Sequence, residues 1–509
     1  MTPAPPDLHR LAAQVIVPVL DLRAGRDRAA EWARAEARAR AGFGAFLLFG
    51  GELPELPERL AALRACAPAG QAPLVCADLE RGLGQQVRGG GRVPPAMALG
   101  AAGSPALARR AGLALGREAR AAGVDWVLGP VLDLADEPRN PIVGTRAFSA
   151  DPARVATLGA AWIEGLEAAG VLGCAKHFPG HGATTDDSHA ALPRVSRSAA
   201  QLRARDLLPF RAAAAVGVGS VMTAHVAYPT LDEPGPATLS PRLVTGLLRG
   251  ELGYHGLVVT DALIMDGVRA DGEDAAACAA LAAGCDVLLY PHEPEAVAAA
   301  VARWASAEPA RAGRLQQAAG RLAAARLRLA AALAPGGPPD RTLALDLARA
   351  ALVRSGPAQP ALQPGDPVGL VLLDDDQQGG FGAELLATLL EAGLRVRVLA
   401  LHPGSDASQD QAAAALLGDA PRGLVVVGCR VRAWKGRPGL HPRLQTLLRG
   451  LPPRGLTVVG LCGPAPLAPA SPPGAASLLA WGDEPAAQRA AAEALLGRIT
   501  PAGRSPAAP

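Results

Sequence analysis

Short apolar runs alternate with helix-forming segments along most of this chain, and this alternation constrains the fold more than any other feature. Gly, Pro or Asp residues bound the runs, and Ala-, Arg-, Leu- and Glu-rich segments separate them. Runs that are apolar on both faces are typical of parallel strands buried under helices. The predicted strands before residue 291 are Val15–Leu20, Ala45–Phe49, Pro73–Ala77, Trp126–Leu132, Leu172–Lys176, Ser220–Ala224, Leu257–Thr260 and Cys285–Tyr290.

Eight strands that alternate with helices predict an N-terminal (β/α)₈ TIM barrel. A doubly wound sheet is the alternative, because periodicity does not distinguish a closed sheet from an open one. Apolar runs resume beyond a proline-rich stretch and predict a smaller α/β sandwich domain. We expect the barrel over residues 1–335, a linker over 336–366 and the second domain over 367–509. The later runs are Val368–Leu373, Val396–Leu401, Leu424–Val427, Thr457–Leu461 and Ser477–Ala480.

Composition limits which classes of partner and which cellular compartment we expect for this chain. A formal net charge of +3 over 509 residues gives no basic stripe for nucleic acid and no reason to expect an acidic partner. Residues 1–10 contain no apolar signal segment, and no apolar run is long enough to span a bilayer. The seven cysteines are scattered without a CxxC pair, which favours a reducing compartment. We therefore expect a cytoplasmic protein with no membrane or nucleic-acid partner; oligomeric state does not follow from composition.

Ionisable residues end four of the predicted barrel strands. The third strand ends at Asp78, the fifth at Lys176 and His177, the sixth at His225 and the seventh at Asp261. In barrel enzymes the active site lies at the carboxyl ends of the strands. A single Asp after a strand is more often a helix N-cap, and a single His is more often structural. Four such ends together predict an active site at this edge.

The segment that follows the fifth strand is the most specific motif in the chain. It reads KHFPGHG over Lys176–Gly182 and continues to DSH over Asp187–His189. It resembles the signature of glycoside hydrolase family 3, in its bacterial β-N-acetylglucosaminidase branch. Other stretches are similar to this family in order and spacing: Asp78–Gly82 (DLERG), Asn140–Phe148 (NPIVGTRAF), Val221–His225 (VMTAH) and Gly256–Met265 (GLVVTDALIM).

The resemblance implies a role for each matching residue. Asp261 would be the nucleophile, and His189, oriented by Asp187, would be the acid/base. An imidazole titrates near neutral pH, so it suits proton transfer to a leaving oxygen and then from water. The implied activity is a retaining, exo-acting hydrolysis of small β-N-acetylglucosaminides from cell-wall fragments, with neither cofactor nor metal. The residues expected to bind sugar are Asp78, Arg146, Lys176, His177 and, as a candidate, His225.

Several alternatives stay open at this point. The same family includes β-glucosidases, and phosphate in place of water would make the enzyme a phosphorylase. Two positions depart from the family pattern: Gln86 stands where this branch often has a substrate-binding Arg, and Ala262 where many relatives have an acidic residue. The first departure leaves the sugar or aglycone contact at Gln86 open. A metal-dependent barrel hydrolase is a weaker alternative, because the first strand has no HxH and the chain has no HExxH. A silent sugar-binding protein is disfavoured by the presence of Asp261, Asp187 and His189.

Overall fold

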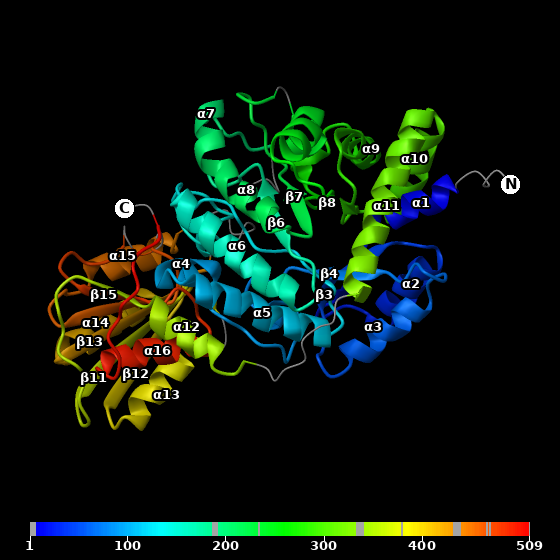
Figure 1. The fold of residues 1–509 in the computed structure, drawn as a ribbon. Coiled ribbons are helices and arrows are strands. Elements are labelled where there is room, and N and C mark those ends of the chain that lie inside the picture. The colour runs from blue at the N-terminus through cyan, green and yellow to red at the C-terminus, as the bar shows by residue number, and fades with distance from the viewer. Residues whose placement is uncertain are drawn as a thin grey trace. The chain divides into compact units, whose positions relative to one another are not determined.

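The protein forms two compact units whose segments interleave along the chain. The computed structural model describes residues 7–185, 192–232, 235–331, 340–377, 380–430, 439–464, 467 and 470–507. The first unit comprises Met1–Gly91, Ala108–Asp133 and Gly159–Pro339, and the second comprises Arg92–Leu107, Leu134–Leu158 and Asp340–Pro509. Figure 1 labels their elements along the chain. Two internal segments thus join the C-terminal unit, and the domain boundaries given above stay a prediction.

Strands form in all eight regions predicted for the first part of the chain. A Pro18 interruption divides the first region into two strands, and the fourth and eighth regions form only two paired residues each. The strands are β1 (Ile16–Val17), β2 (Val19–Leu22), β3 (Ala45–Gly50), β4 (Leu74–Ala77), β5 (Trp126–Val127), β6 (Cys174–Phe178), β7 (Ser220–Thr223), β8 (Leu257–Thr260) and β9 (Leu288–Leu289).

The pairings among these strands are all parallel. They run β2-β3-β4-β5 and β6-β7-β8, and β1 pairs with β9. Single parallel bridges between Trp126 and Leu172, and between Val259 and Val287, connect neighbouring strand regions. Because side chains on both faces are buried, these runs are almost uninterruptedly apolar. The mixed α/β class with parallel strands is confirmed.

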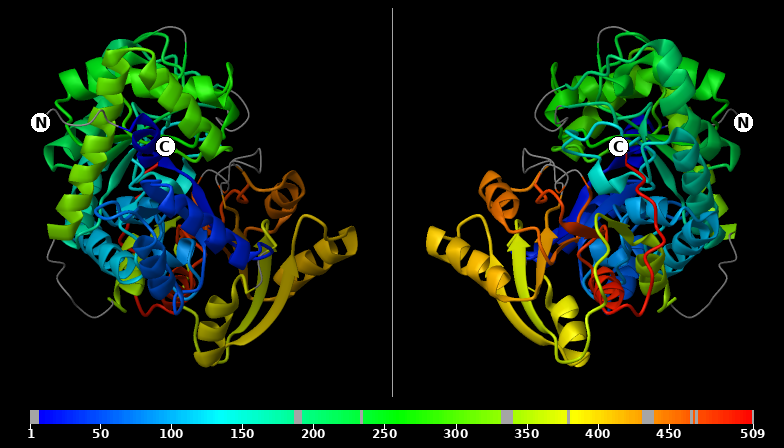
Figure 2. Two further views of the ribbon diagram at one scale, coloured as in Figure 1. Left: turned by 90° about the vertical axis from the view of Figure 1, so that its right-hand side faces the viewer. Right: turned by 90° about the vertical axis from the view of Figure 1, so that its left-hand side faces the viewer.

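Helices lie outside the strands of the first unit, as both views in Figure 2 show. Asp27 caps α2 by accepting a hydrogen bond from the Ala30 amide, and Trp32, Ala35 and Ala39 form its buried face. The helices are α1 (Leu8–Gln14), α2 (Arg28–Arg40), α3 (Leu56–Ala65), α5 (Pro105–Ala121), α6 (Pro152–Ala168), α7 (Ala199–Gln201), η3 (Leu202–Asp206), α8 (Leu207–Ala215), η5 (Arg242–Glu251), α9 (Glu273–Ala283), α10 (Pro294–Ser306) and α11 (Pro309–Ala331). Single 3₁₀ turns occur at η1 (Leu83–Gln85), η4 (Ala237–Leu239) and η6 (Asp266–Val268).

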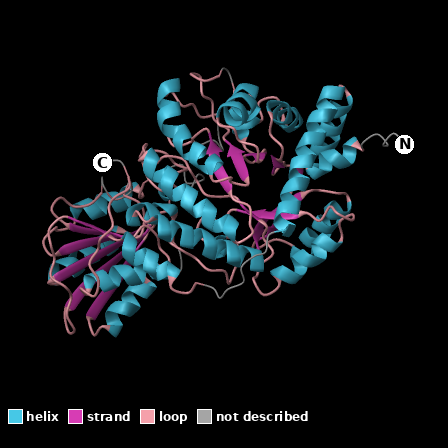
Figure 3. Cartoon of the chain, in the orientation of Figure 1, coloured by secondary structure: helices cyan, strands magenta, loops and turns pink. Residues whose placement is uncertain are grey.

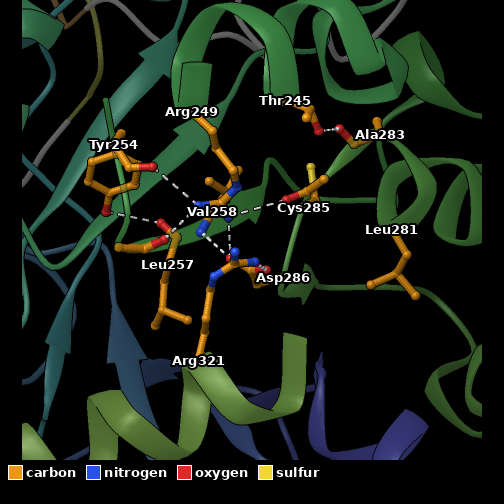
Figure 4. Close-up of polar contacts among 12 residues, drawn as sticks. Thr245, Arg249, Tyr254, Leu257, Val258, Leu281, Ala283, Cys285, Asp286 and Arg321 are labelled. Atoms are coloured by element: carbon orange, nitrogen blue, oxygen red, sulfur yellow. Dashed lines mark hydrogen bonds and ion pairs between the residues drawn. The ribbon is translucent and has the colours of Figure 1, made fainter. Parts of the chain in front are cut away.

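A buried carboxylate connects two helices to the amino-terminal end of β9. Asp286 is fully buried and accepts hydrogen bonds from Arg249 (2.6 Å), Arg314 (2.9 Å) and Arg321 (2.8 Å). Its Oδ2 also accepts one from the Val258 amide at 3.0 Å. Figure 4 shows Arg249 of η5 and Arg321 of α11 reaching Asp286 from different elements. One carboxylate therefore neutralises part of a concentrated positive charge at this end of the strands.

The second unit contains a six-stranded sheet in the order β10-β15-β14-β13-β11-β12, in which only β10 runs antiparallel to its neighbour. Helices accompany its strands in Figure 3. Alternate residues of β11 enter different apolar clusters, Leu370 and Leu372 one and Val371 and Leu373 the other, so both faces are covered. The strands are β10 (Val353–Ser355), β11 (Pro367–Asp374), β12 (Arg395–Leu401), β13 (Arg422–Gly428), β14 (Leu456–Gly460) and β15 (Ala476–Leu479).

The range predicted as linker contains regular structure. Helix α12 (Leu343–Ala351) and strand β10 both form within it, and Leu343, Leu347 and Ala351 bury one face of α12. The other helical elements of this unit are α4 (Ala96–Ala102), η2 (Gly144–Arg146), α13 (Ala383–Glu391), α14 (Ala407–Asp419), α15 (Pro442–Gly450) and α16 (Pro485–Leu495). Across the described ranges, no helix has the length and hydropathy to cross a membrane.

Candidate active site

Lys176, at the carboxyl end of β6, is held between two carboxylates. Its Nζ lies 2.8 Å from Asp78 Oδ1 and 2.8 Å from Glu80 Oε1, in the segment after β4. The Lys176 side chain is only 2% exposed, whereas Asp78 is 31% exposed. A buried ammonium requires such partners, since its desolvation is otherwise costly. The arrangement fixes a positive charge at the site and leaves Asp78 accessible to a ligand.

The His177 ring contacts another carboxylate, that of Asp133, which is fully buried. The ring Nδ1 is 2.6 Å from Asp133 Oδ2, and the His177 amide donates to Oδ1 at 3.2 Å. The His181 amide donates to the same Oδ1 at 2.6 Å. Burial alone raises the pKa of Asp133, but the interactions with His177 and His181 outweigh it and hold that pKa below its usual value. Asp133 is therefore ionised at neutral pH.

Asp261 follows β8 and is partly exposed. Its amide donates to the Thr223 carbonyl of β7, and its Oδ1 accepts from the Ala262 amide at 2.7 Å. Burial raises the pKa of Asp261, but attraction to His177, His225 and Lys176 and the Ala262 hydrogen bond bring it below its usual value. An accessible carboxylate that is ionised at neutral pH is what nucleophilic attack requires.

His225 follows β7 and is fully buried. Its Nδ1 lies 2.8 Å from the Thr238 hydroxyl oxygen, and its Nε2 donates to the Ala262 carbonyl at 3.2 Å. Burial lowers the pKa of His225, more strongly than Asp261 raises it. The ring therefore braces the residue after Asp261, and its expected contact with sugar stays a prediction.

The other expected site residues fall elsewhere. Arg146 belongs to the second unit, where its Nη1 donates to the Ile142 carbonyl at 3.3 Å. Asp187 and His189 lie outside the described residues. The structure thus brings together Asp78, Lys176, His177, His225 and Asp261 of the first unit, through the contacts and electrostatic interactions described above. Within the described ranges, no group of His, Cys, Asp and Glu side chains has the arrangement of a metal site.

Two of the carboxylates, Asp133 and Glu80, were not among the expected site residues. Both carry a signal in the sequence. Asp133 directly follows the fourth predicted strand, as Asp78 and Asp261 follow theirs, and Glu80 lies two residues after Asp78. Asp133 stands between Leu132 and Leu134, so it resembles an isolated polar residue in an apolar stretch. Its partners become evident only once β6 is placed beside it.

His181 is buried and its Nδ1 lies 2.9 Å from the Thr184 hydroxyl oxygen. Burial lowers the pKa of His181 from 6.5 to about 4, against the opposing influence of Asp133. The folded protein therefore keeps this ring neutral at a pH where the unfolded chain protonates it. Stability is unaffected above pH 6.5 and is lost as pH falls from 6.5 toward 4.

We expect His181→Gln to flatten this pH dependence. The lowering of the His181 pKa from 6.5 to about 4 by burial corresponds to about 3 kcal/mol of unfolding free energy. Urea unfolding midpoints of the variant should fall less than those of the wild type between pH 7 and pH 4.5, a window set by the two pKa values. His255→Gln, at an exposed histidine, is the control and should keep the wild-type slope. An unchanged slope in the His181 variant would contradict the assignment.

Comparison with known proteins gives a consistent result. Residues 25–325 match the glycosyl hydrolase family 3 N-terminal domain. A beta-hexosaminidase of Stenotrophomonas maltophilia is 43% identical over 245 residues, covering 47% of this chain and 71% of that protein. One from Chromobacterium violaceum is 40% identical over 273 residues, covering 52% and 76%. A solved family 3 beta-N-acetylglucosaminidase from Paenibacillus sp. matches 99% of both chains with a TM-score of 0.86 and 29% identity.

Proposed function

The chain belongs to glycoside hydrolase family 3 and is a glycosidase, and from this premise we propose that it is a retaining, exo-acting β-N-acetylglucosaminidase. The observation that carries the proposal is the ionised, accessible Asp261 carboxylate near Lys176 and His177. The names of the relatives support the sugar, since two matching proteins are beta-hexosaminidases and a matching structure is a beta-N-acetylglucosaminidase. The substrate of this chain is a small carbohydrate.

The proposed reaction has two displacements. Asp261 attacks the anomeric carbon, the bond to the leaving oxygen breaks, and His189 gives that oxygen its proton. The neutral His189 then accepts a proton from water, whose oxygen attacks the anomeric carbon and releases the Asp261 carboxylate. Asp187 orients the His189 ring, as a carboxylate does in a Ser-His-Asp triad. This step sequence needs no metal or cofactor.

Sugar binding falls to the charged groups around Asp261. Asp78 accepts hydrogen bonds from sugar hydroxyls, Lys176 donates to them, and the His177 ring donates or accepts beside it. Arg146 stays a predicted sugar-binding residue. Hydrogen bonds that involve an ionised group are stronger than neutral ones and orient the ring. The pairing of Lys176 with Asp78 and Glu80 supports this arrangement, because it fixes the ammonium before a ligand arrives.

The proposal also covers the domain architecture and the cellular role of the protein. The parallel pairings and single bridges support a closed (β/α)₈ barrel over residues 1–335. The six-stranded sheet and its helices support an α/β sandwich over 367–509, and the predicted connection 336–366 also contributes α12 and β10. The seven scattered cysteines, which form no CxxC pair, support a cytoplasmic location. The proposed role in recycling cell-wall peptidoglycan fragments rests on the proposed sugar.

A panel of nitrophenyl β-glycosides tests the substrate. We expect turnover of the β-N-acetylglucosaminide to exceed that of the β-glucoside and β-xyloside, and to survive exhaustive chelation. Much faster turnover of the β-glucoside would contradict the sugar assignment. Loss on chelation that zinc restores would indicate a metal hydrolase instead. In phosphate buffer, sugar 1-phosphate as the main product would identify a phosphorylase with the same residues.

His189→Ala tests the acid/base role through leaving-group dependence. We expect glycosides with poor leaving groups to lose turnover by about 100-fold or more, because their oxygen needs a proton as the bond breaks. Activated aryl glycosides need little protonation, so kcat/KM should fall less for them. Equal losses for both classes, measured as kcat/KM ratios, would overturn the acid role of His189.

A further inference from the structure

Asp133 lies in the first unit directly beside the residues expected to bind sugar, yet no step of the proposed reaction uses it. Three nitrogens of one short segment, 177–181, face its carboxylate: the His177 and His181 backbone amides and the His177 ring Nδ1. We propose that Asp133 is a positioning residue, which holds the His177 ring with Nδ1 protonated and leaves Nε2 for the sugar. The identity of that ligand rests on the proposed function.

The two carboxylate oxygens of Asp133 have different partners. Oδ1 accepts both backbone amides, from His177 at 3.2 Å and from His181 at 2.6 Å. Oδ2 faces the His177 ring, 2.6 Å from Nδ1. Oδ1 therefore fixes the backbone at the end of β6, and Oδ2 fixes the orientation of the His177 ring.

The contact with Oδ2 determines which nitrogen of the ring carries the proton. An ionised carboxylate only accepts hydrogen bonds, so Nδ1 must donate whether the imidazole is neutral or charged. Only Nε2 is then available to a sugar hydroxyl. The arrangement also resists rotation of the ring, since both His177 and Asp133 are buried. A ring that is fixed before binding loses little entropy when the sugar binds.

Asp133→Asn separates these two functions of the carboxylate. A carboxamide has one oxygen and one NH₂ group. The two backbone amides can only donate, so they retain the oxygen, and the NH₂ group must face Nδ1. Nδ1 then becomes an acceptor and the proton moves to Nε2. The substitution should therefore reverse the tautomer of His177 while the segment keeps its course.

The direct test is spectroscopic and does not require turnover. In full-length protein labelled with ¹⁵N-histidine, His177→Gln assigns the His177 ring signals. We expect the wild-type spectrum to show a protonated Nδ1, and the Asp133→Asn spectrum to show a bare Nδ1 and a protonated Nε2. A bare Nδ1 in the wild type would overturn the proposal, even if the Asp133 variant failed to fold.

Kinetics provide the second test, because loss of folded protein lowers the amount of active enzyme, whereas loss of positioning raises KM. Asp133→Asn should raise KM for the N-acetylglucosaminide by about 10- to 100-fold, because this is the change in affinity expected when one charge-assisted hydrogen bond is lost. Asp286→Asn, at another fully buried carboxylate of this unit, should lower the folded fraction and leave KM unchanged. In a His177→Gln background, Asp133→Asn should change KM by less than about threefold, because the two residues act together.

The outcomes separate this inference from the proposed function. If the wild type turned over no N-acetylglucosaminide, the proposed sugar would be wrong, yet the ring spectra would still decide the role of Asp133. If turnover were found but Asp133→Asn left both KM and the His177 tautomer unchanged, the positioning role would be wrong. Equal KM effects in the presence and absence of His177 would assign Asp133 to the backbone alone.

Discussion

Replacing Asp261 with alanine is expected to lower turnover of the N-acetylglucosaminide by on the order of 10⁴-fold or more. The variant retains Lys176, His177 and Asp78, so its affinity for N-acetylglucosamine should persist in calorimetric titration. Azide should restore part of the turnover, because a small anion can occupy the space of the missing carboxylate. The product should then be the α-glycosyl azide, formed by a single displacement.

Asp266→Ala is the matched control for this loss. Asp266 lies five residues after Asp261, but its side chain is 62% exposed and pairs with Arg269. It should retain turnover close to that of the wild type. If Asp261→Ala kept substantial activity and Asp266→Ala lost it, the nucleophile would be misassigned. Loss of both activity and sugar binding in Asp261→Ala would instead indicate a collapsed site.

Asp286→Asn is expected to cause a large loss of stability in the first unit. It leaves Arg249, Arg314 and Arg321 around a neutral group, although burial already lowers the pKa of Arg249 more strongly than Asp286 raises it. Removing one partner from a buried ionic cluster costs about 3 kcal/mol or more. The thermal midpoint of this unit should therefore fall by about 5 °C.

Turnover by the folded fraction should survive Asp286→Asn. Asp286 precedes β9, whereas the site residues lie at or just after the carboxyl ends of strands, and parallel strands place these two ends at opposite edges of a sheet. Glu308→Gln removes the exposed pair with Arg311 at the start of α11 and should change the midpoint by less than about 1 °C. Equal midpoints for the Asp286 and Glu308 variants would contradict a structural role for the buried cluster.

The sequence predicted much of the first unit because buried parallel strands have a local signature. Each apolar run overlaps its strand, although β6 extends to Phe178 beyond the predicted Lys176, and β5 ends at Val127 rather than at Leu132, before a stretch that includes Pro130. Strand β10 has no such signature, since it is a three-residue antiparallel edge strand with exposed residues. The membership of residues 92–107 and 134–158 in the second unit depends on long-range contacts. No local pattern encodes such contacts.

The candidate site was predictable to the extent that its residues interrupt apolar runs. Lys176 and His177 do so within β6, and Asp78 and Asp261 follow their strands directly. Asp133 obeys the same rule, but its flanking leucines make it resemble a structural residue. Its partners, His177 and His181, lie more than 40 positions later, and the hydrogen bonds that unite them exist only in the folded chain.

Covalent trapping tests the central claim, nucleophilic attack by Asp261, most directly. Fluorine at C5 of an N-acetylglucosaminyl fluoride slows both displacements by destabilising positive charge at the anomeric centre, and the fluoride leaving group lets the first proceed. Mass spectrometry of a digest should then find one sugar on the peptide that contains Asp261, and none in Asp261→Ala. A sugar attached to Asp266 or Glu80 instead would contradict the account.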